Sequence, residues 1–412
     1  MIAAFVAVLG CLVVPIATAK SSRAEPGSTG SMASSVSVGS MAPSVSVASM
    51  APSVSVGSMA SGVSVASSAS SGRAAEDDRV VGEVHGVAHT ASAAIRDAER
   101  SDEVRFTVWY PAQAGAEESP ITLGPPGNPL FVVGSSAADA PVADGRWPVL
   151  LLSHGNGGTA RMMGWFGTAM ARAGYVVVAA DHPGNNGIDA MTAAGSILMW
   201  NRADDLAAAW AAVQADPRLS AHVDAKRLGL VGYSVGGYTA LVAAGARPDM
   251  ARLVAFCEAT PKDGVCAPQL ENPEFTFERR MALAAAPQIA PWVARSGEDR
   301  RIPNVRAVFM MAPAVVQAFA PAELSKMDVP LSVVVGEADA VASPATNSQV
   351  IGEANDRARL KLLPAVGHYD FLSECTALGR ERVGPLCESR ADRAVTHQAA
   401  IQQAKAVFDP AL

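Results

Sequence analysis

The chain has 412 residues and a formal net charge of −7; 50% of its residues are hydrophobic and 17% are charged. This composition excludes a wholly disordered chain. The mild acidity argues against nucleic acid as the main partner, because phosphate binding needs clustered Lys and Arg. Beyond residue 19, no apolar stretch reaches the roughly 18 residues of a membrane-spanning helix, which argues against a polytopic membrane protein.

Residues 1–19 (MIAAFVAVLGCLVVPIATA) have the features of an export signal. The segment is apolar and ends in Ala17-Thr18-Ala19, an A-x-A cleavage pattern. It lacks the usual basic start, so a short anchor is an alternative. Cys11 faintly resembles a lipoprotein site, but the apolar run continues past it. We therefore expect a signal peptide at 1–19 and export from a bacterial cell, to the periplasm or beyond it.

Residues 20–79 contain a repeat with a period of nine. Copies of the SMASSVSVG unit begin at Ser31, Ser40, Ser49 and Ser58. Ser, Ala, Gly and Pro dominate, so the segment has few large side chains with which to form a core. We expect a disordered linker or stalk. A glycosylated or adhesive surface segment is the alternative.

From residue 80 to residue 412, strand-like and helix-like segments alternate. Short apolar runs such as 148–153 (PVLLLS) and 175–180 (YVVVAA) are typical of strands covered on both faces. Helical periodicity lies between them, as at 202–216. Further strands are expected at 104–110, 227–232, 305–311 and 330–336, and a further helix at 159–173. This alternation predicts an α/β domain with a mostly parallel central sheet and helices on both faces.

The sequence Gly-Tyr-Ser-Val-Gly at 232–236 follows an expected strand and precedes a helix-like stretch. This is the context of the G-x-S-x-G turn that exposes a serine hydroxyl at the end of a strand. Glycine is needed because the turn is sharp, and the start of the helix offers N–H groups to a developing oxyanion. We predict that Ser234 is a nucleophile. A simple tight turn is the alternative.

The glycine-rich segment 153–158 (SHGNGG) follows another expected strand. Its backbone can approach a substrate oxygen, so we expect the N–H groups of Asn156 and Val235 to form an oxyanion hole. A turn with no chemical role is the alternative. We expect His154 to hold this loop by hydrogen bonds and to line the substrate site.

A nucleophilic serine needs a histidine to take its proton and a carboxylate to orient that histidine. In α/β folds that carry a G-x-S-x-G turn, the chain order of these three residues is serine, acid, histidine. Only His368 and His397 follow Ser234 among the histidines. His368 lies in a loop after a short apolar run, whereas His397 lies in a helical segment that we expect at the solvated surface. His368 is therefore the predicted base.

The carboxylate is expected just beyond a buried strand. Asp339 is the natural choice there, with Glu337 and Asp370 as alternatives. Two more side chains are expected near the substrate: Tyr233, beside the nucleophile, and His182, in a loop at the same edge of the sheet.

Together these motifs resemble a known family. The chain is similar to α/β-hydrolases of the bacterial predicted dienelactone hydrolase group, which are related to plasma platelet-activating-factor acetylhydrolase. The segments that carry the resemblance lie between about residues 80 and 410: VWYPA at 108–112, LSHGNGG at 152–158, DHPGNN at 181–186, GYSVGGYTA at 232–240 and GHYDFL at 367–372.

The resemblance implies an α/β-hydrolase fold that forms an acyl-enzyme and uses no metal or organic cofactor. It assigns the triad and the oxyanion hole to the residues already named, Ser234, Asp339, His368, Asn156 and Val235. True dienelactone hydrolases use a cysteine nucleophile, so the serine argues against lactone specificity. The residue before the nucleophile is tyrosine, where many relatives have histidine.

Four cysteines follow the leader: Cys257, Cys266, Cys375 and Cys387. An even number in an exported protein suggests two disulfides. Three pairings are possible, and we favour the local pairs, Cys257 with Cys266 and Cys375 with Cys387. Free thiols in a cytosolic enzyme are the alternative. A metal site is not expected, because there is no C-x-x-C pair and no nearby histidine cluster.

Residues 249–303 separate the helix after the nucleophile from the next expected strand. This connection is too long to lack structure of its own, so we expect a helical cap insertion over the active site. Its apolar residues would suit an acyl chain or an aromatic ester, or would form the cap's own core. They are Phe275, Phe277, Met281, Pro291 and Trp292.

These observations predict a serine carboxylic-ester hydrolase acting on short-acyl, aryl, lipid or polyester-type esters. A serine amidase or peptidase of the same fold is one alternative. A non-catalytic surface protein on a hydrolase scaffold, with the repeat as a stalk, is another. The expected partner is a small-molecule ester, with a lipid or polymer surface as a further candidate, and the expected assembly is a monomer or homodimer.

Overall fold

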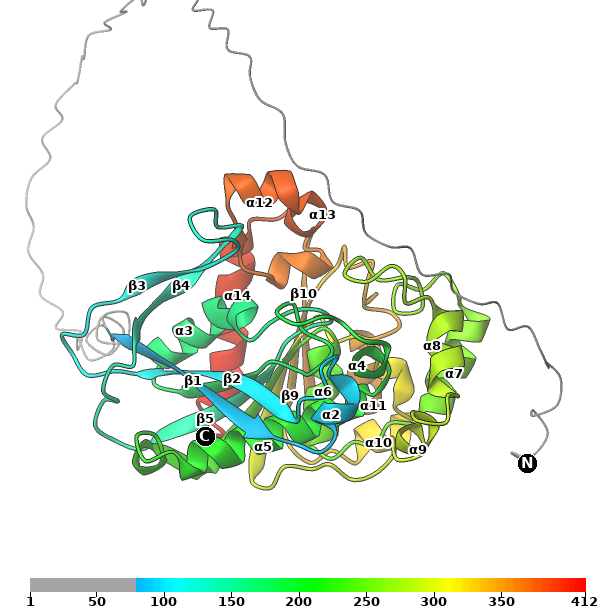
Figure 1. Ribbon diagram of the computed structural model, residues 1–412, viewed down its shortest axis with the longest axis horizontal. Helices are drawn as coiled ribbons and strands as arrows, with labels where there is room; N and C mark the ends of the chain where they lie inside the picture. Colours follow the sequence, from blue (N-terminus) through cyan, green and yellow to red (C-terminus); the bar gives the residue numbers. More distant parts are fainter. Residues whose placement is uncertain (1–78) are drawn as a thin grey trace, which may run out of the picture. The chain divides into compact units, whose positions relative to one another are not determined.

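The computed structural model describes residues 79–412. The predicted signal peptide at 1–19 and all but the last residue of the predicted linker at 20–79 lie outside the described residues. The described chain forms one mixed sheet with the strand order β10-β9-β8-β7-β5-β6-β2-β1-β4-β11, and β3 pairs with β4 (Figure 1). The strands are β1 (Val81–His89), β2 (Glu103–Pro111), β3 (Ser119–Leu123), β4 (Phe131–Ala138), β5 (Trp147–Ser153), β6 (Val176–Ala180), β7 (Val223–Tyr233), β8 (Val305–Met311), β9 (Leu331–Gly336), β10 (Ala358–Leu363) and β11 (Glu374–Cys375).

The central part of the sheet is parallel. Each strand from β10 to β6, in the order above, runs parallel to its neighbour. All residues of β6 and β9 are buried, as continuous apolar runs predict for strands covered on both faces. The predicted fold class, a mostly parallel sheet in an α/β domain, is confirmed.

The other side of the sheet is largely antiparallel. β2 pairs antiparallel with both β6 and β1, and β4 pairs antiparallel with β3 and β11. Of these strands, β2 and β6 were expected from the sequence, whereas β1, β3, β4 and β11 were not. β4 (FVVGSSAA) mixes buried and half-buried small polar residues, so it carries no apolar run that would have predicted a strand.

Helices cover both faces of the sheet. On one face α3 packs on β2 and β6, and α14 packs on β8 and β9; on the other, α5 packs on β6 and α6 on β7 and β8 (Figure 1). The helices are α2 (Ala93–Arg96), α3 (Gly164–Arg172), α4 (Ala193–Ile197), α5 (Arg202–Ala215), α6 (Val235–Ala243), α7 (Met250–Ala259), α8 (Phe277–Ala284), α9 (Ala290–Val293), α10 (Pro321–Ser325), α11 (Ser348–Ala354), α12 (Ala377–Arg382), α13 (Gly384–Cys387) and α14 (Arg393–Phe408), with short 3-10 turns at Arg161–Met163, Met199–Asn201, Ser220–His222, Val316–Ala318 and His368–Phe371.

Residues 249–303, the helical insert, carry α7, α8 and α9. A small apolar cluster of its own joins Cys257, Val265 and Cys266 to Ala314 and Ala342, which lie in the loops after β8 and β9. Helix α8 also packs on α4 (Figure 1). The insert is therefore attached at the carboxyl ends of the parallel strands, where the site-forming loops of such sheets lie. In residues 79–412, no helix is long and apolar enough to cross a membrane.

Candidate active site

Ser234 occupies the sharp turn between β7 and α6. Its backbone has φ 55° and ψ −123°, a region that residues with a side chain rarely adopt. The flanking glycines make the turn possible. A Cβ on Gly232 would lie 2.0 Å from the Gly236 carbonyl oxygen, and one on Gly236 would lie 2.0 Å from the Ser153 carbonyl oxygen. The backbone thus presents the serine hydroxyl at the end of the strand.

His368 and Asp339 lie beside this serine in a continuous row of hydrogen bonds. Nε2 of His368 is 2.9 Å from Ser234 Oγ, and its Nδ1 is 2.8 Å from Asp339 Oδ2. The second carboxylate oxygen of Asp339 accepts hydrogen bonds from the backbone N–H groups of Val341 and Ala342, at 2.9 and 2.7 Å. A carboxylate can only accept, so Nδ1 carries the proton and Nε2 is free to accept one from the serine.

The surroundings of His368 raise the pKa of its imidazole above the ordinary value. Burial alone would lower the pKa of this imidazole, because it penalises the charged form. The negative charge and hydrogen bond of Asp339, together with the negative charge of Glu271, outweigh that cost, and the net effect is a raised pKa. His368 is therefore suited to hold a proton transiently near neutral pH.

Two backbone N–H groups near Ser234 have no acceptor among the described residues. They belong to Val235, the first residue of α6, and to Asn156, in the glycine-rich loop after β5. The first N–H groups of a helix lack intrahelical partners, because no preceding turn supplies carbonyl oxygens for them. The side chain of Asn156 is held by Asn185, whose Nδ2 donates to Asn156 Oδ1 at 2.9 Å. Both N–H groups are therefore free to receive a developing oxyanion.

A buried polar network holds the glycine-rich loop in place. Arg202 donates to the carbonyl oxygen of His154. His182 bridges Ser153 and Asp205, with 2.9 Å from its Nε2 to Ser153 Oγ and 2.9 Å from its Nδ1 to Asp205 Oδ2. Burial, with the positive charge of Arg202, lowers the pKa of His182 to about 3, so this imidazole is neutral at neutral pH.

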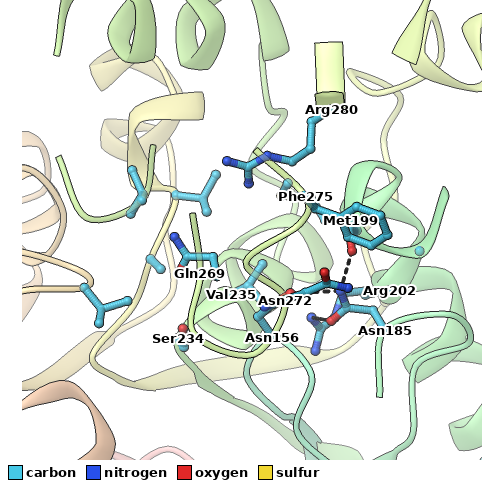
Figure 2. A pocket seen from close by; sticks show the side chains of 16 residues that line it. Asn156, Asn185, Met199, Arg202, Ser234, Val235, Gln269, Asn272, Phe275 and Arg280 are labelled. Atoms are coloured by element: carbon cyan, nitrogen blue, oxygen red, sulfur yellow. Dashed lines mark hydrogen bonds between the residues drawn. The ribbon is translucent and has the colours of Figure 1, made fainter. Parts of the chain in front are cut away.

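Two cavities meet at Ser234 and Asn156, which line both of them. The arginine chamber lies toward the insert (Figure 2). It is lined by Asn156, Asn185, Gly195, Ser196, Met199, Arg202, Ser234, Val235, Val265, Gln269, Asn272, Phe275, Arg280, Ala314, Val315 and Val341. The tyrosine chamber is lined by residues 154–158, Met162, Met163, Tyr233, Ser234, Glu271, His368, Tyr369, Leu372 and Leu386.

The family of the chain follows from comparison with known proteins. The model of the family described as serine aminopeptidase, S33, a family of hydrolases, matches residues 147–375. The chain belongs to this family. The matched residues run from β5 to β11 and include every residue of the Ser234–His368–Asp339 row. The S33 assignment and the sheet topology together establish an α/β-hydrolase fold.

A search of curated proteins gave no match to this S33 family member. Among solved structures, it is similar to a ferulic acid esterase from Streptomyces cinnamoneus. The two share 17% sequence identity, and the TM-score is 0.49 over 81% of this chain and 89% of the esterase chain.

The histidines of this S33 hydrolase do not all lie where the sequence suggested. His154 and Tyr233 line the tyrosine chamber. His182 was expected near the substrate, but it is fully buried and lines neither chamber, because its ring serves the network under the loop. His397 was expected at the surface. Instead it is 7% exposed, stacks on Trp165 with 3.7 Å between ring centroids, and bonds to the Leu372 carbonyl oxygen.

The alternative acids do not contact His368. Glu337 is exposed, and Asp370 accepts a hydrogen bond from the N–H of Gly367 at 2.7 Å. The disulfides join Cys257 to Cys266 and Cys375 to Cys387, the local pairs expected from the sequence. Among residues 79–412, no three His, Cys, Asp or Glu side chains are grouped so as to hold a metal ion.

Sequence reasoning missed the three charged residues of the chambers other than the imidazoles: Arg202, Glu271 and Arg280. Glu271 and Arg280 belong to the insert, in no motif, and only folding brings them near Ser234. Arg202 begins α5, where its position suggested no more than a helix start. Of the apolar insert residues, Phe275 lines the arginine chamber, whereas Phe277 and Trp292 pack on core clusters.

Proposed function

We propose that this protein is a serine carboxylic-ester hydrolase that works through Ser234, His368 and Asp339. The observation that carries the proposal is the hydrogen-bonded row Ser234–His368–Asp339 at the junction of two chambers, beside two free backbone N–H groups. A nucleophile, a base, an orienting carboxylate and oxyanion donors are the parts that acyl transfer requires.

In the proposed reaction, Ser234 Oγ attacks the ester carbonyl carbon while its proton moves to Nε2 of His368. The N–H groups of Asn156 and Val235 donate to the resulting oxyanion. The carbon–oxygen bond to the alcohol then breaks, and His368 returns the proton to the leaving alcohol. Water, deprotonated by the same imidazole, attacks the acyl-enzyme, releasing the carboxylic acid and free Ser234. Asp339 keeps the proton on Nδ1 and stabilises the imidazolium.

The substrate class we propose is that of short-acyl, aryl, lipid or polyester-type esters. Apolar side chains on both sides of Ser234 support it, including Val235, Phe275 and Val341 in the arginine chamber and Leu372 and Leu386 in the tyrosine chamber. We also propose a relationship to predicted dienelactone hydrolases and platelet-activating-factor acetylhydrolase. The matching family model itself assigns the chain only to the S33 hydrolases.

The proposal is tested with p-nitrophenyl esters from acetate to decanoate, using the purified protein and its Ser234→Ala variant. We expect hydrolysis by the wild type and its loss in the variant, with unchanged circular dichroism. The chain length at which activity peaks reports the usable depth of the chamber. A folded wild-type protein that hydrolyses no member of the series would overturn the proposal.

Amide hydrolysis is the second candidate function, and the position of Glu271 favours it. Glu271 lines the tyrosine chamber with a buried carboxylate oxygen, Oε2, that has no hydrogen-bond partner among the described residues. A carboxylate so placed suits an ammonium group, and the matching family is described as serine aminopeptidases. Aminoacyl p-nitroanilides test this candidate; a kcat/KM above that for the esters would move the assignment to an amidase or peptidase.

We also propose that the protein is exported. Two disulfides in the described chain suit an oxidising compartment, and residues 1–19 carry the A-x-A pattern. Mass spectrometry of the mature N-terminus tests this, with cleavage after Ala19 expected; an intact Met1 on the protein from its native host would contradict it.

A further inference from the structure

The arginine chamber has an unusual charge balance for an apolar ester site. Two guanidinium groups, Arg202 and Arg280, line it, and none of its lining residues is Asp or Glu. The tyrosine chamber has the opposite balance, since its acidic residue Glu271 has no Lys or Arg beside it in the lining. The two halves of a substrate therefore meet different electrostatic surroundings.

Arg280 reaches the chamber from α8. Figure 2 shows its side chain on the opposite side of the chamber from Ser234, Asn156 and Arg202. Its hydrogen-bond partner in the described chain is a neutral one, the Cys266 carbonyl oxygen at 3.4 Å from Nη2, and no carboxylate lies within ion-pair distance. Burial lowers the pKa of Arg280, with the exposed Glu278 opposing that effect. A partly desolvated cation without a counter-ion is costly unless a ligand supplies one.

The neighbouring Arg279 shows the contrast. It is exposed, its Nη1 lies 3.5 Å from Glu274 Oε2, and its guanidinium lies over the Phe275 ring. Arg279 therefore has its charged partner outside the chamber, whereas Arg280, the next residue on the same helix, faces into the chamber.

Arg202 adds a second cation at the other end of the chamber, and it has no contact ion pair among the described residues. Only 1% of it is exposed, its hydrogen bonds go to neutral groups of residues 153, 154 and 185, and its Nε has no partner among the described residues. The nearest acid in its network, Asp205, is already engaged by Arg96 and His182. Two guanidinium groups, the buried Arg202 and the half-buried Arg280, thus raise the positive potential of one chamber.

The catalytic geometry decides which half of an ester enters this chamber. The leaving oxygen must lie within reach of His368, because that imidazole protonates it. His368 lines the tyrosine chamber and not the arginine chamber. Of the two oxyanion donors, Val235 lines the arginine chamber alone, and Asn156 lies where the two chambers meet. The alcohol half therefore occupies the tyrosine chamber, and the acyl half occupies the arginine chamber.

We propose that the acyl half carries a carboxylate at its far end, so that the substrates are monoesters of dicarboxylic acids, bound through the Arg280 guanidinium. This inference rests on the proposed ester hydrolysis. The reaction consumes one water and yields the alcohol and the free dicarboxylate, with the distal carboxylate unchanged throughout. Apolar side chains of the arginine chamber, including Val235, Val315 and Val341, suit the chain that links the ester to the distal carboxylate.

The test compares p-nitrophenyl hexanoate with mono-p-nitrophenyl adipate, which has the same chain length and differs by its terminal carboxylate. We expect kcat/KM for the adipate ester to exceed that for the hexanoate ester by about 10- to 100-fold, the range for a hydrogen bond to a charged group. Arg280→Met should lower the ratio of the two values by at least about tenfold, and Arg280→Lys should restore part of it. Arg279→Met is the matched control and should leave the ratio unchanged.

The outcomes separate the two proposals. A wild-type protein that hydrolyses hexanoate at least as well as the adipate ester, with a ratio that Arg280→Met does not alter, overturns the dicarboxylate proposal and leaves ester hydrolysis standing. A wild-type protein that hydrolyses neither ester overturns both. Because each variant is judged by a ratio measured on one preparation, partial loss of folded protein does not imitate the expected result.

Discussion

Nε2 of His182 lies 2.9 Å from Ser153 Oγ, the same distance that separates His368 from Ser234. Asp205 completes this second row as Asp339 completes the first. The two rows differ in access: Ser153 and His182 are fully buried, and neither chamber reaches them. Their electrostatics also differ, because the pKa of His182 is lowered and that of His368 is raised. The Ser153 row is therefore a structural support beneath the site.

The buried support predicts a large stability cost for Asp205→Asn. Asp205 pairs with Arg96 at 2.6 Å in a fully buried site, so removing its charge leaves a guanidinium without compensation. We expect the free energy of unfolding to fall by about 3–5 kcal/mol in urea denaturation. Asp139→Asn, which removes an exposed partner of Arg218, is the control and should cost under about 1 kcal/mol. Equal effects of the two substitutions would contradict this assignment.

Acid should destabilise the protein partly through His397. Burial lowers the pKa of His397 from 6.5 to about 4, so the folded state disfavours the proton that the unfolded chain accepts below pH 6.5. The contribution of the neutral His397 to the free energy of unfolding is therefore complete above pH 6.5 and is lost as the pH falls toward 4. We expect His397→Phe, which keeps a ring against Trp165, to flatten the decline in unfolding free energy over that range. An equally steep decline in the variant would be inconsistent with a neutral buried imidazole.

Asp339→Asn should impair the reaction without unfolding the protein. An asparagine at 339 can present an N–H to Nδ1 of His368, which favours the tautomer whose Nε2 cannot take the serine proton. We expect kcat to fall by about 10³–10⁴-fold. The control is Glu337→Gln, an exposed neighbour in the same loop, which should retain wild-type kcat. Comparable losses in both variants would assign the effect to the loop rather than to the carboxylate.

Glu271→Gln should shift the acid limb of the pH–rate profile. Glu271 is one of the negative charges that raise the pKa of His368. Removing it lowers that pKa, so the imidazole becomes a free base at lower pH, and the midpoint of kcat/KM against pH moves downward. Glu274→Gln, an exposed neighbour, is the matched control. An unmoved or raised midpoint for Glu271→Gln would show that this carboxylate does not act on His368.

The central sheet was predictable because its strands are buried on both faces. Runs such as 175–180 have no polar alternation, and burial on both faces demands that pattern. β1 was missed because polar and small residues interrupt it, and its pairing with β2 becomes apparent only in three dimensions. His397 was misplaced because the buried side of α14 also carries Arg393 and Thr396, which read as a solvated surface.

The candidate site could be predicted where local sequence dictates geometry. The strand–turn–helix at Ser234 is such a case, and chain order led to His368 and Asp339. The chambers were not predictable, because Arg280 and Glu271 lie in the insert, far along the chain from their neighbours in space. No periodicity or motif marks a side chain whose role depends on how an insert folds back over the sheet.

The location of the reactive serine tests the proposed catalytic role of Ser234 most directly. The protein is treated with a fluorophosphonate, which forms a stable adduct only with an activated serine hydroxyl, and its peptides are mapped by mass spectrometry. We expect one adduct, on Ser234, which disappears in Ser234→Ala and leaves Ser153 unmodified. A folded wild-type protein without an adduct on Ser234, or one labelled on another serine, would contradict that role.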